Sequence, residues 1–248
     1  MDQIAIISDV HSNLPALEAV LADIAGRGIE QIYCLGDLVG KGPDSACVVD
    51  LCRERCAAVV KGNWDDKLAE SGGGRTRRWH QTQLGAERLD YLRTLPNTID
   101  FLLSGKRVRL FHASAQDIYY RVGFWHDQNE LRGMFANTPF TGFASPPPDI
   151  VGYGDIHHPY LLPVAGKTLF NVGSVGNPMD YIPLAGYVIM RGHFDSSRFG
   201  QIGTEIIRLP YDIEAALAQA RAVDMPKLAE YAFELRHANH RSQMPDLG

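Results

Sequence analysis

The chain has 248 residues, of which 45% are hydrophobic and 21% are charged, and its 24 basic and 29 acidic residues give a net charge of −5. This composition is that of an ordinary globular protein rather than a disordered one, and no apolar run reaches membrane-spanning length. A broad basic surface is also missing, so we expect neither a nucleic-acid duplex nor a membrane as a partner.

The start of the chain and its cysteines bear on the compartment. The first residues pass directly into an apolar run, without the basic region and cleavage site of an export signal, so we expect a cytoplasmic protein. The four cysteines lack the paired spacing of a structural zinc site. We expect them to be reduced thiols, buried or partly buried, at Cys34, Cys47, Cys52 and Cys56.

Short apolar runs alternate with helical stretches over the first 61 residues, which predicts the order βαβαβ. The predicted elements are a strand at 4–7, a helix at 14–27, a strand at 32–35, a helix at 45–55 and a strand at 58–61. The first helix has Ser12 or Asn13 as its N-cap and Pro15 in its first turn, both of which are typical helix-start signals. These local signals agree with the apolar periodicity.

The remainder of the chain predicts one more helix, six strands and a helical tail. In order, we expect a helix at 82–95, strands at 99–103, 108–111, 150–153, 168–172, 186–190 and 204–209, and packing helices within about 211–240. The aromatic-rich segment at about 113–149 is too long for a plain connection, so we interpret it as a lid-like insertion. No linker divides the chain, and we expect a single domain over 1–248.

A basic cluster, Arg75, Arg77 and Arg78, follows three consecutive glycines. We favour a solvated surface turn for this cluster, and the alternative is a role in steering phosphate.

Polar residues that can bind metal ions follow five of the apolar runs. They are Asp9 and His11, Asp37, Asn63, His112, and Asp155 with His157. The carboxyl ends of parallel strands meet at one edge of a sheet, so we expect these side chains to converge. Because clustered acids repel one another unless a cation neutralises them, the pattern predicts a metal site.

These residues stand in motifs with a recognisable order. The motifs are Asp9-Val10-His11, Gly36-Asp37-Leu38-Val39-Gly40, Gly62-Asn63-Trp64-Asp65, His112 and Gly154-Asp155-Ile156-His157. Together they resemble the calcineurin-like metallophosphoesterase family, in particular its bacterial phosphodiesterase and dinucleoside tetraphosphatase-like branch, over residues 4 to about 178. The resemblance implies an α/β (α+β) fold, a four-layer αββα sandwich of two mixed sheets flanked by helices, and a hydrolase acting on phosphoric ester or phosphoanhydride bonds.

The same resemblance implies two divalent metal ions and assigns a role to each ligand. The first ion would take Asp9, His11 and His157, the second would take Asn63, His112 and Asp155, and Asp37 would bridge them. This mixture of carboxylate, amide and imidazole ligands favours Mn or Fe, with Mg, Zn or Ni as alternatives. Asp37, Asn63 and His112 are then the expected catalytic residues, because they help to activate water for attack on phosphorus.

Two positions depart from the family pattern. Asp155 stands where a histidine is expected; we expect its carboxylate to ligate, and the alternative is that His158 is recruited instead. Trp64 replaces a histidine that is thought to assist the leaving group, and an indole donates no proton usefully. The missing acid matters least for good leaving groups, which favours activated diesters or phosphoanhydrides. His80, His126, His158 or the arginine cluster are the alternatives for that role.

The function that we expect is hydrolysis of a phosphodiester or phosphoanhydride bond in a small, nucleotide-like substrate. Trp64, Tyr119 and Tyr120 are the expected substrate-binding residues, since aromatic rings of the lid can stack on a base or aryl group. A phosphomonoesterase or protein phosphatase is the first alternative. The second is a non-catalytic scaffold with the same fold, although such relatives usually lack several ligands.

Overall fold

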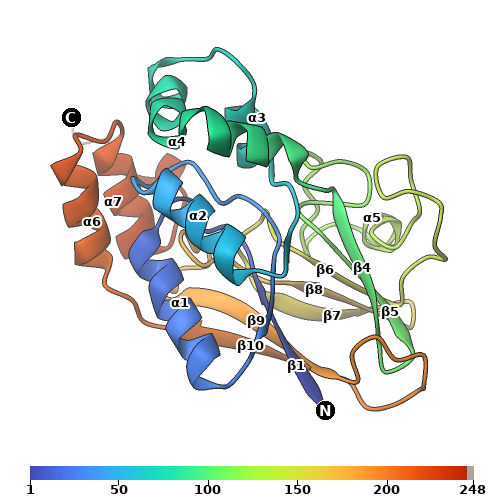
Figure 1. The fold of residues 1–248 in the computed structure, drawn as a ribbon. Coiled ribbons are helices and arrows are strands. Elements are labelled where there is room, and N and C mark those ends of the chain that lie inside the picture. The colour runs from blue at the N-terminus through green and yellow to red at the C-terminus, as the bar shows by residue number, and fades with distance from the viewer. Residues whose placement is uncertain (245–248) are drawn as a thin grey trace.

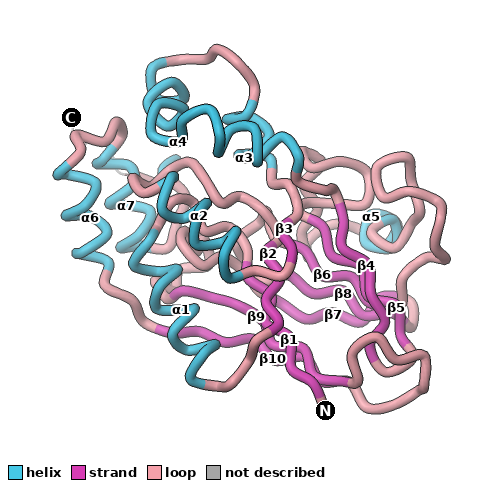
Figure 2. The backbone as a smooth tube through the Cα atoms, in the orientation of Figure 1, coloured by secondary structure: helices cyan, strands magenta, loops and turns pink. Residues whose placement is uncertain are grey.

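Two five-stranded sheets lie face to face in the computed structural model, which describes residues 1–244, and helices cover the outside (Figure 1). The first sheet has the order β10-β9-β1-β2-β3 and the second the order β4-β5-β6-β8-β7 (Figure 2). The strands of the first sheet are β1 (Asp2–Ile7), β2 (Gln31–Cys34), β3 (Ala58–Val59), β9 (Ala185–Gly192) and β10 (Gly203–Leu209). Those of the second are β4 (Thr98–Leu103), β5 (Lys106–Phe111), β6 (Ile150–Tyr153), β7 (Tyr160–Val164) and β8 (Lys167–Asn171).

Both sheets are mixed, and each has parallel strands at its centre. In the first, β1, β2 and β3 run parallel, while β9 is antiparallel to β1 and to β10. In the second, β5, β6 and β8 run parallel, and β4 and β7 pair antiparallel at the two edges. The predicted metal ligands follow the carboxyl ends of β1, β2, β3, β5 and β6; they lie on loops except for Asn63, which is the first residue of a helix.

The alternation of side chains in β1 explains how one strand serves two cores. Ile4 and Ile6 belong to the core between the sheets, whereas Ala5 and Ile7 belong to the core under the helices. All four side chains are fully buried. Successive side chains of a strand point to opposite faces of its sheet, so an apolar run without polar interruptions indicates a strand covered on both faces.

Helices form the layer outside the first sheet. They are α1 (Leu14–Gly26), α2 (Ser45–Arg55), α3 (Asn63–Ala69), α4 (Arg75–Thr94), α6 (Ile213–Ala222) and α7 (Leu228–His237), and a short 3-10 turn follows at Arg241–Gln243. Asn13 caps α1 as expected, because its side chain accepts a hydrogen bond from the backbone N–H of Ala16 at 3.3 Å. The opposite face of the second sheet is covered by α5 (Gln128–Gly133) and the irregular segment around it. The predicted four-layer architecture is thus confirmed, with a thin outer layer on this side.

Several local predictions need correction. Arg75, Arg77 and Arg78 do not form a surface turn, because α4 begins at Arg75 and continues across a kink at Gly85, whose φ is 70°. The short helix α3 and the edge strand β7 are not predicted from the sequence, since neither carries a clear apolar period. Cys47 is exposed rather than buried, while all four cysteines are free thiols.

Within residues 1–244, none of the helices combines the length and the apolar character that crossing a bilayer requires.

Candidate metal centre

The structure gathers the seven predicted ligands at the carboxyl ends of the parallel strands of both sheets. The first sheet supplies residues that follow β1, β2 and β3, and the second supplies residues that follow β5 and β6. Six of the seven side chains belong to buried residues, namely Asp9, His11, Asp37, His112, Asp155 and His157, and Asn63 is half-buried. The convergence that the sequence predicted is therefore present in the fold.

The backbone at these positions takes an unusual conformation. Asp9, His11, Asp37, Asp155 and His157 all have a positive φ, between 48° and 62°. The left-handed region is uncommon for residues other than glycine, and such strain concentrates at functional sites. Here the left-handed conformation turns the backbone sharply after each strand, so that the side chains point to one centre and the strand ends.

The approach of the two sheets at this point requires a glycine at position 154. A Cβ atom there would lie 2.1 Å from Ser8 Oγ and 2.5 Å from Asp9 Oδ2. The backbone N–H of Asp155 donates to the same Asp9 oxygen at 3.1 Å. Gly154 therefore lets the loop after β6 contact the carboxylate that follows β1.

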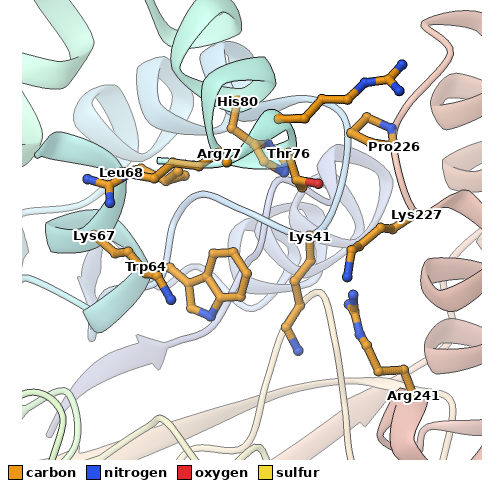
Figure 3. Close-up of a pocket in the computed structure, with 12 residues that line it drawn as sticks. Lys41, Trp64, Lys67, Leu68, Thr76, Arg77, His80, Pro226, Lys227 and Arg241 are labelled. Atoms are coloured by element: carbon orange, nitrogen blue, oxygen red, sulfur yellow. The ribbon is translucent and has the colours of Figure 1, made fainter. Parts of the chain in front are cut away.

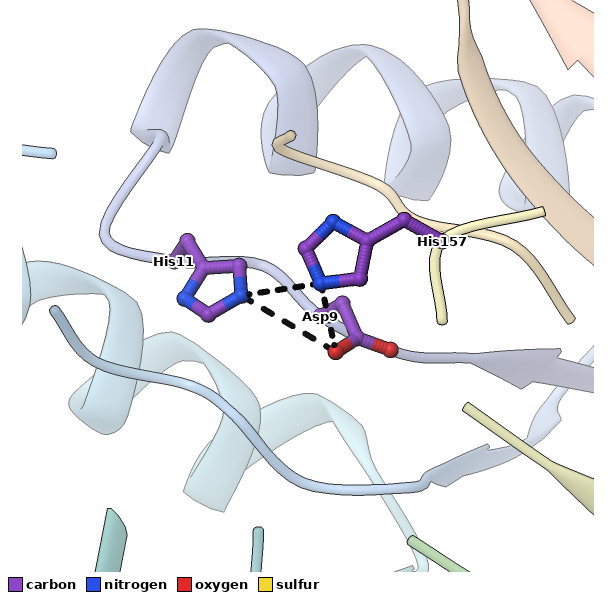
Figure 4. A group of neighbouring side chains, drawn as sticks. All are labelled: Asp9, His11 and His157. Carbon is purple, nitrogen blue, oxygen red and sulfur yellow. Dashed lines mark hydrogen bonds and ion pairs between the residues drawn. The ribbon is translucent and has the colours of Figure 1, made fainter. Parts of the chain in front are cut away.

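Asp9, His11 and His157 form the first group (Figure 4). His157 Nε2 lies 3.1 Å from Asp9 Oδ1 and 3.2 Å from His11 Nε2, and His11 Nε2 lies 3.9 Å from Asp9 Oδ1. Two imidazole nitrogens and one carboxylate oxygen thus face the same small volume, an arrangement suited to a divalent transition-metal ion.

Asp9, Asp37 and His112 form the second group. The two oxygens of Asp37 span the site, since Oδ2 lies 3.5 Å from His11 Nε2 and Oδ1 lies 3.5 Å from His112 Nε2. Asp9 is common to both groups, and Asp37 lies between a histidine of the first group and the histidine of the second. Either carboxylate is placed to be shared by two ions.

The hydrogen bonds of the three imidazoles fit metal binding. His11 Nδ1 donates to the carbonyl of Val39 at 3.2 Å, His112 Nδ1 donates to the carbonyl of Leu35 at 2.8 Å, and His157 Nδ1 donates to the carbonyl of Asn177. With the proton on Nδ1, each ring presents the lone pair of Nε2 to the centre, which is the tautomer a metal ligand needs.

Unpaired buried atoms point to the same conclusion. Asp9 Oδ1 and His112 Nε2 are buried and have no hydrogen-bond partner among the described residues. Buried polar atoms are rarely left unpaired, because the lost hydration is not replaced. A cation at the centre would satisfy both atoms, so the donor set fits the divalent ions that the family resemblance implies.

The charge balance shows what the centre lacks. Burial raises the pKa of Asp37 well above its ordinary value, and the neighbouring carboxylates of Asp9 and Asp65 add to this effect. Although burial alone would lower the pKa of His112, the carboxylates of Asp37, Asp9 and Asp155 raise it to about 9. The protein atoms by themselves therefore hold excess negative charge, which a divalent ion would neutralise.

Asp155 has other partners than the sequence indicated. Arg121 donates to both of its oxygens, from Nε to Oδ2 and from Nη2 to Oδ1, each at 2.8 Å. Asn63 Nδ2 donates to the same Oδ1 at 2.9 Å. Asp155 Oδ1 lies 3.8 Å from His112 Nε2, and Asp155 belongs to neither of the two groups described above. No sequence signal marked Arg121, an isolated basic residue among the aromatic residues of the lid.

Trp64 forms part of the centre and its cavity. Its backbone N–H donates to Asp37 Oδ1 at 2.7 Å, and its ring meets the His11 ring edge-on at 5.8 Å between centroids. A Cβ at position 40 would lie 2.3 Å from the Trp64 ring, so Gly40 makes room for the indole. The ring lines a cavity of about 410 Å³ together with Arg121 and His157.

Tyr119 and Tyr120 do not reach this cavity. Tyr119 is 55% exposed and its hydroxyl donates to Asp66 at 2.8 Å, while Tyr120 is 40% exposed and its hydroxyl donates to Glu130 at 2.9 Å. Neither tyrosine lines the cavity beside the metal ligands, whereas Arg121, the next residue, does. The lid turns its arginine toward the centre and leaves its two tyrosines at the surface.

The histidines named as substitutes for the missing acid are distributed over three places. His158 lines the cavity beside the metal ligands. His80 is buried in α4, outside this cavity, with its Nδ1 3.4 Å from Ser45 Oγ. His126 is engaged locally, since its Nδ1 accepts from the backbone N–H of Gly123 at 2.9 Å.

An ionic cluster behind the cavity wall leaves no signal in the sequence. Glu234 of α7 is fully buried, and its carboxylate pairs with Arg241 at 2.5 Å and lies 3.7 Å from Lys41 Nζ. Lys41 Nζ also donates to Asn177 Oδ1 at 2.5 Å. The predicted packing of the tail is therefore accompanied by a contribution to the site, because Asn239 and His240 line the same cavity as the ligands.

Comparisons with known proteins bear on the family and the fold. The calcineurin-like phosphoesterase superfamily domain matches residues 3–193. The uncharacterized protein MJ0912 of Methanocaldococcus jannaschii is 34% identical over 224 residues, which are 86% of this chain and 89% of that protein. The crystal structure of a metallophosphoesterase from Sphaerobacter thermophilus superposes with a TM-score of 0.74 and 28% identity, covering 95% of this chain and 99% of that one. The hypothetical protein PH1004 of Pyrococcus horikoshii OT3 shares the fold, with a TM-score of 0.77, 16% identity and coverage of 97% and 100%.

Proposed function

The chain belongs to the calcineurin-like phosphoesterase superfamily, and on this premise we propose that it is a hydrolase that depends on two divalent metal ions. Its substrate is a small, nucleotide-like molecule, in which it cleaves a phosphodiester or phosphoanhydride bond. The observation that carries the proposal is the set of three buried imidazoles, each held by a backbone carbonyl so that Nε2 faces Asp9 or Asp37. A divalent cation would accept the three Nε2 lone pairs and neutralise the carboxylates beside them.

The ligands divide between the two ions as follows. Asp9, His11 and His157 would hold the first ion, and His112, Asn63 and, once its carboxylate is free of Arg121, Asp155 would hold the second. Asp37 would be shared between them. Manganese or iron suits this mixture of oxygen and nitrogen donors best. A divalent ion so bound supplies Lewis acidity toward phosphate and makes water more acidic.

The remaining residues position the substrate. The side chain of Arg121 lines the cavity and is 58% exposed, so once Asp155 binds the second ion the guanidinium can donate its N–H groups to phosphate oxygens instead. Trp64 provides the flat wall of the cavity. Neither residue transfers a proton near neutral pH, which supports a substrate whose leaving group needs no acid.

A phosphomonoesterase remains the second candidate, and a substrate panel separates the two. With Mn²⁺, bis(p-nitrophenyl) phosphate and dinucleoside tetraphosphate should be hydrolysed more efficiently than p-nitrophenyl phosphate. A clear preference for the monoester would transfer the assignment to the monoesterase. An absence of turnover and of stoichiometric metal would favour the scaffold instead.

The variant Asp37→Asn tests the centre itself. Replacing the carboxylate that spans His11 and His112 should lower kcat by at least about a hundredfold while the fold persists, because a neutral amide is a poorer metal ligand and stabilises less charge. Activity is compared at matched metal occupancy, with Asp90→Asn on the surface as the control. Near-normal turnover of Asp37→Asn would contradict the assignment.

A further inference from the structure

A second cavity adjoins the metal centre and is strongly basic. It measures about 330 Å³ and lies between α3, the start of α4 and the connection from α6 to α7 (Figure 3). Lys41 and Trp64 line both this cavity and the one that contains the metal ligands. A molecule bound at the metal centre can therefore extend past Trp64 into the basic cavity.

The charge of the basic cavity is one-sided. Six of its twelve lining residues are lysine or arginine and none is acidic, although the whole chain has a net charge of −5. Glu234 compensates Lys41 and Arg241 from behind the wall, and Glu70 pairs with Arg77 at 3.4 Å. Lys67, Arg75 and Lys227 have no ion-pair partner within the described part of the chain. An anion of several charges would balance this excess.

The start of α4 adds a second, independent indication. Its N-cap is Gly74, which offers no side-chain acceptor, and its first turn has no acidic residue. The first turn instead carries Arg75, Arg77 and Arg78, although a helix dipole disfavours cations at this end. Gly74, Arg75 and Arg77 line the basic cavity, so the free backbone N–H groups of the first turn can donate hydrogen bonds to a negatively charged ligand there.

An unpaired donor provides the third indication. Arg77 Nε is buried and has no hydrogen-bond partner among residues 1–244, although Nη2 of the same side chain donates to the backbone carbonyl of Glu70. Buried guanidinium N–H groups are costly to leave unpaired. Phosphate oxygens in the basic cavity would meet this donor, the helix N-terminus and the unpaired lysines together.

We propose that the basic cavity binds the phosphate groups that continue beyond the scissile phosphorus, so that the natural substrate is a small molecule carrying a chain of phosphoanhydride-linked phosphates. The inference rests on the proposed function, since it takes the scissile phosphorus to lie at the metal ligands. It deepens that function by selecting polyphosphorylated substrates over simple diesters. Lys67, Arg75 and Lys227 are the residues that make the selection.

A binding experiment tests the cavity without any catalysis. Inorganic tripolyphosphate is titrated into metal-free protein in the presence of EDTA by isothermal calorimetry, at low and moderate salt. The wild type should bind with an affinity that falls as salt rises, and the triple variant Lys67→Gln/Arg75→Gln/Lys227→Gln should bind at least about tenfold more weakly. Equal binding by both proteins would overturn the proposal, as would no binding by the wild type.

A charge-matched control excludes a general effect of net charge. The variant Arg55→Gln/Arg132→Gln/Arg198→Gln removes three exposed charges that line neither cavity, and it should bind tripolyphosphate like the wild type. A loss as large as that of the first triple variant would overturn the proposal. Titration with adenosine triphosphate in place of tripolyphosphate identifies the source of the phosphate chain. If adenosine triphosphate binds the wild type more tightly than tripolyphosphate does, and the first triple variant loses this binding, the ligand is a nucleoside polyphosphate. If the two ligands bind equally, the cavity recognises the phosphate chain alone.

Selectivity in catalysis supplies the last measurement. In the loaded enzyme, the ratio of kcat/KM for dinucleoside tetraphosphate to that for bis(p-nitrophenyl) phosphate should fall about tenfold in the triple variant at Lys67, Arg75 and Lys227. An unchanged ratio with intact turnover would overturn the inference and leave the proposed function standing. A third outcome separates the two proposals. If the wild type hydrolyses neither substrate but binds tripolyphosphate, and the triple variant does not bind it, the result would support the basic cavity and contradict the proposed function.

Discussion

Under the proposed function, the contact between Arg121 and Asp155 would compete with binding of the second ion, and the variant Arg121→Ala tests this competition. The guanidinium occupies both oxygens of Asp155 at 2.8 Å, and Asn63 donates to one of them. Oδ1, the oxygen that lies 3.8 Å from His112 Nε2, accepts from both donors, so an ion that binds this oxygen must displace one of them. Removing Arg121 should therefore tighten the binding of the second ion and leave the first unaffected.

The magnitude follows from the geometry of the pair. A hydrogen bond to a charged group is worth about 1.5–3 kcal/mol. Because 58% of the Arg121 side chain is exposed, solvent screening reduces the net contribution of the pair to about 1 kcal/mol. This energy corresponds to about a fivefold change in affinity.

Titration of metal-free protein with Mn²⁺ by calorimetry resolves the two binding steps. The second step should tighten about fivefold in Arg121→Ala, while the step at Asp9, His11 and His157 should change less than about twofold. Arg132→Ala, an exposed arginine of α5 away from both cavities, serves as the control. A second step that is unchanged or weaker in Arg121→Ala would refute the reasoning, since the guanidinium and the ion would then not share Asp155.

Three further substitutions test the surroundings of the centre. Burial lowers the pKa of His80 to about 4 from its ordinary 6.5, so the unfolded chain takes up a proton before the folded protein does as the pH falls. His80 should therefore lower the free energy of unfolding by about 2 kcal/mol between pH 7 and pH 5. The variant His80→Gln should abolish this loss, as measured by urea denaturation. Glu234→Gln should lower the free energy of unfolding by about 3 kcal/mol at pH 7, because two cations lose a buried partner. Gly154→Ala should weaken the first Mn²⁺ step about tenfold by displacing Asp9, whose Oδ2 would lie 2.5 Å from the new Cβ.

Each of these substitutions has a matched control. His237 lies at the exposed end of α7, and the variant His237→Gln should keep the wild-type dependence of the free energy of unfolding on pH. The same dependence in His80→Gln would contradict the role of burial. Glu54→Gln is exposed and should change the free energy of unfolding little, and a similarly small effect of Glu234→Gln would show that the buried pair contributes nothing net. Gly133→Ala introduces a Cβ with nothing within 4 Å, so its metal binding should equal that of the wild type, whereas intact binding in Gly154→Ala would rule out the close approach.

The sequence predicted the strand ends and the residues that follow them because both depend on local patterns. Apolar runs placed β1, β2, β5 and β6, and the polar residue after each run marked the centre. The parallel order of the strands then brought distant positions together. The motif order supplied the family, and the comparisons confirm it.

The features that escaped prediction depend on contacts between segments far apart in the chain. Arg121 pairs with Asp155 across 34 positions, and Glu234 meets Lys41 from the tail. Neither contact leaves a period or spacing in the sequence. Arg75 was assigned to a turn because three glycines precede it, yet α4 starts there at the edge of the basic cavity.

The division of labour along the chain has an evolutionary consequence. The ligands all come from positions 9 to 157, whereas Lys227, Asn239, His240 and Arg241 reach the two cavities from the tail. Under the proposed function, mutation of Lys227 or His240 could change substrate preference while the predicted ligands stay in place. Glu234 has no such freedom, because it bonds to Asn177, whose carbonyl accepts from His157.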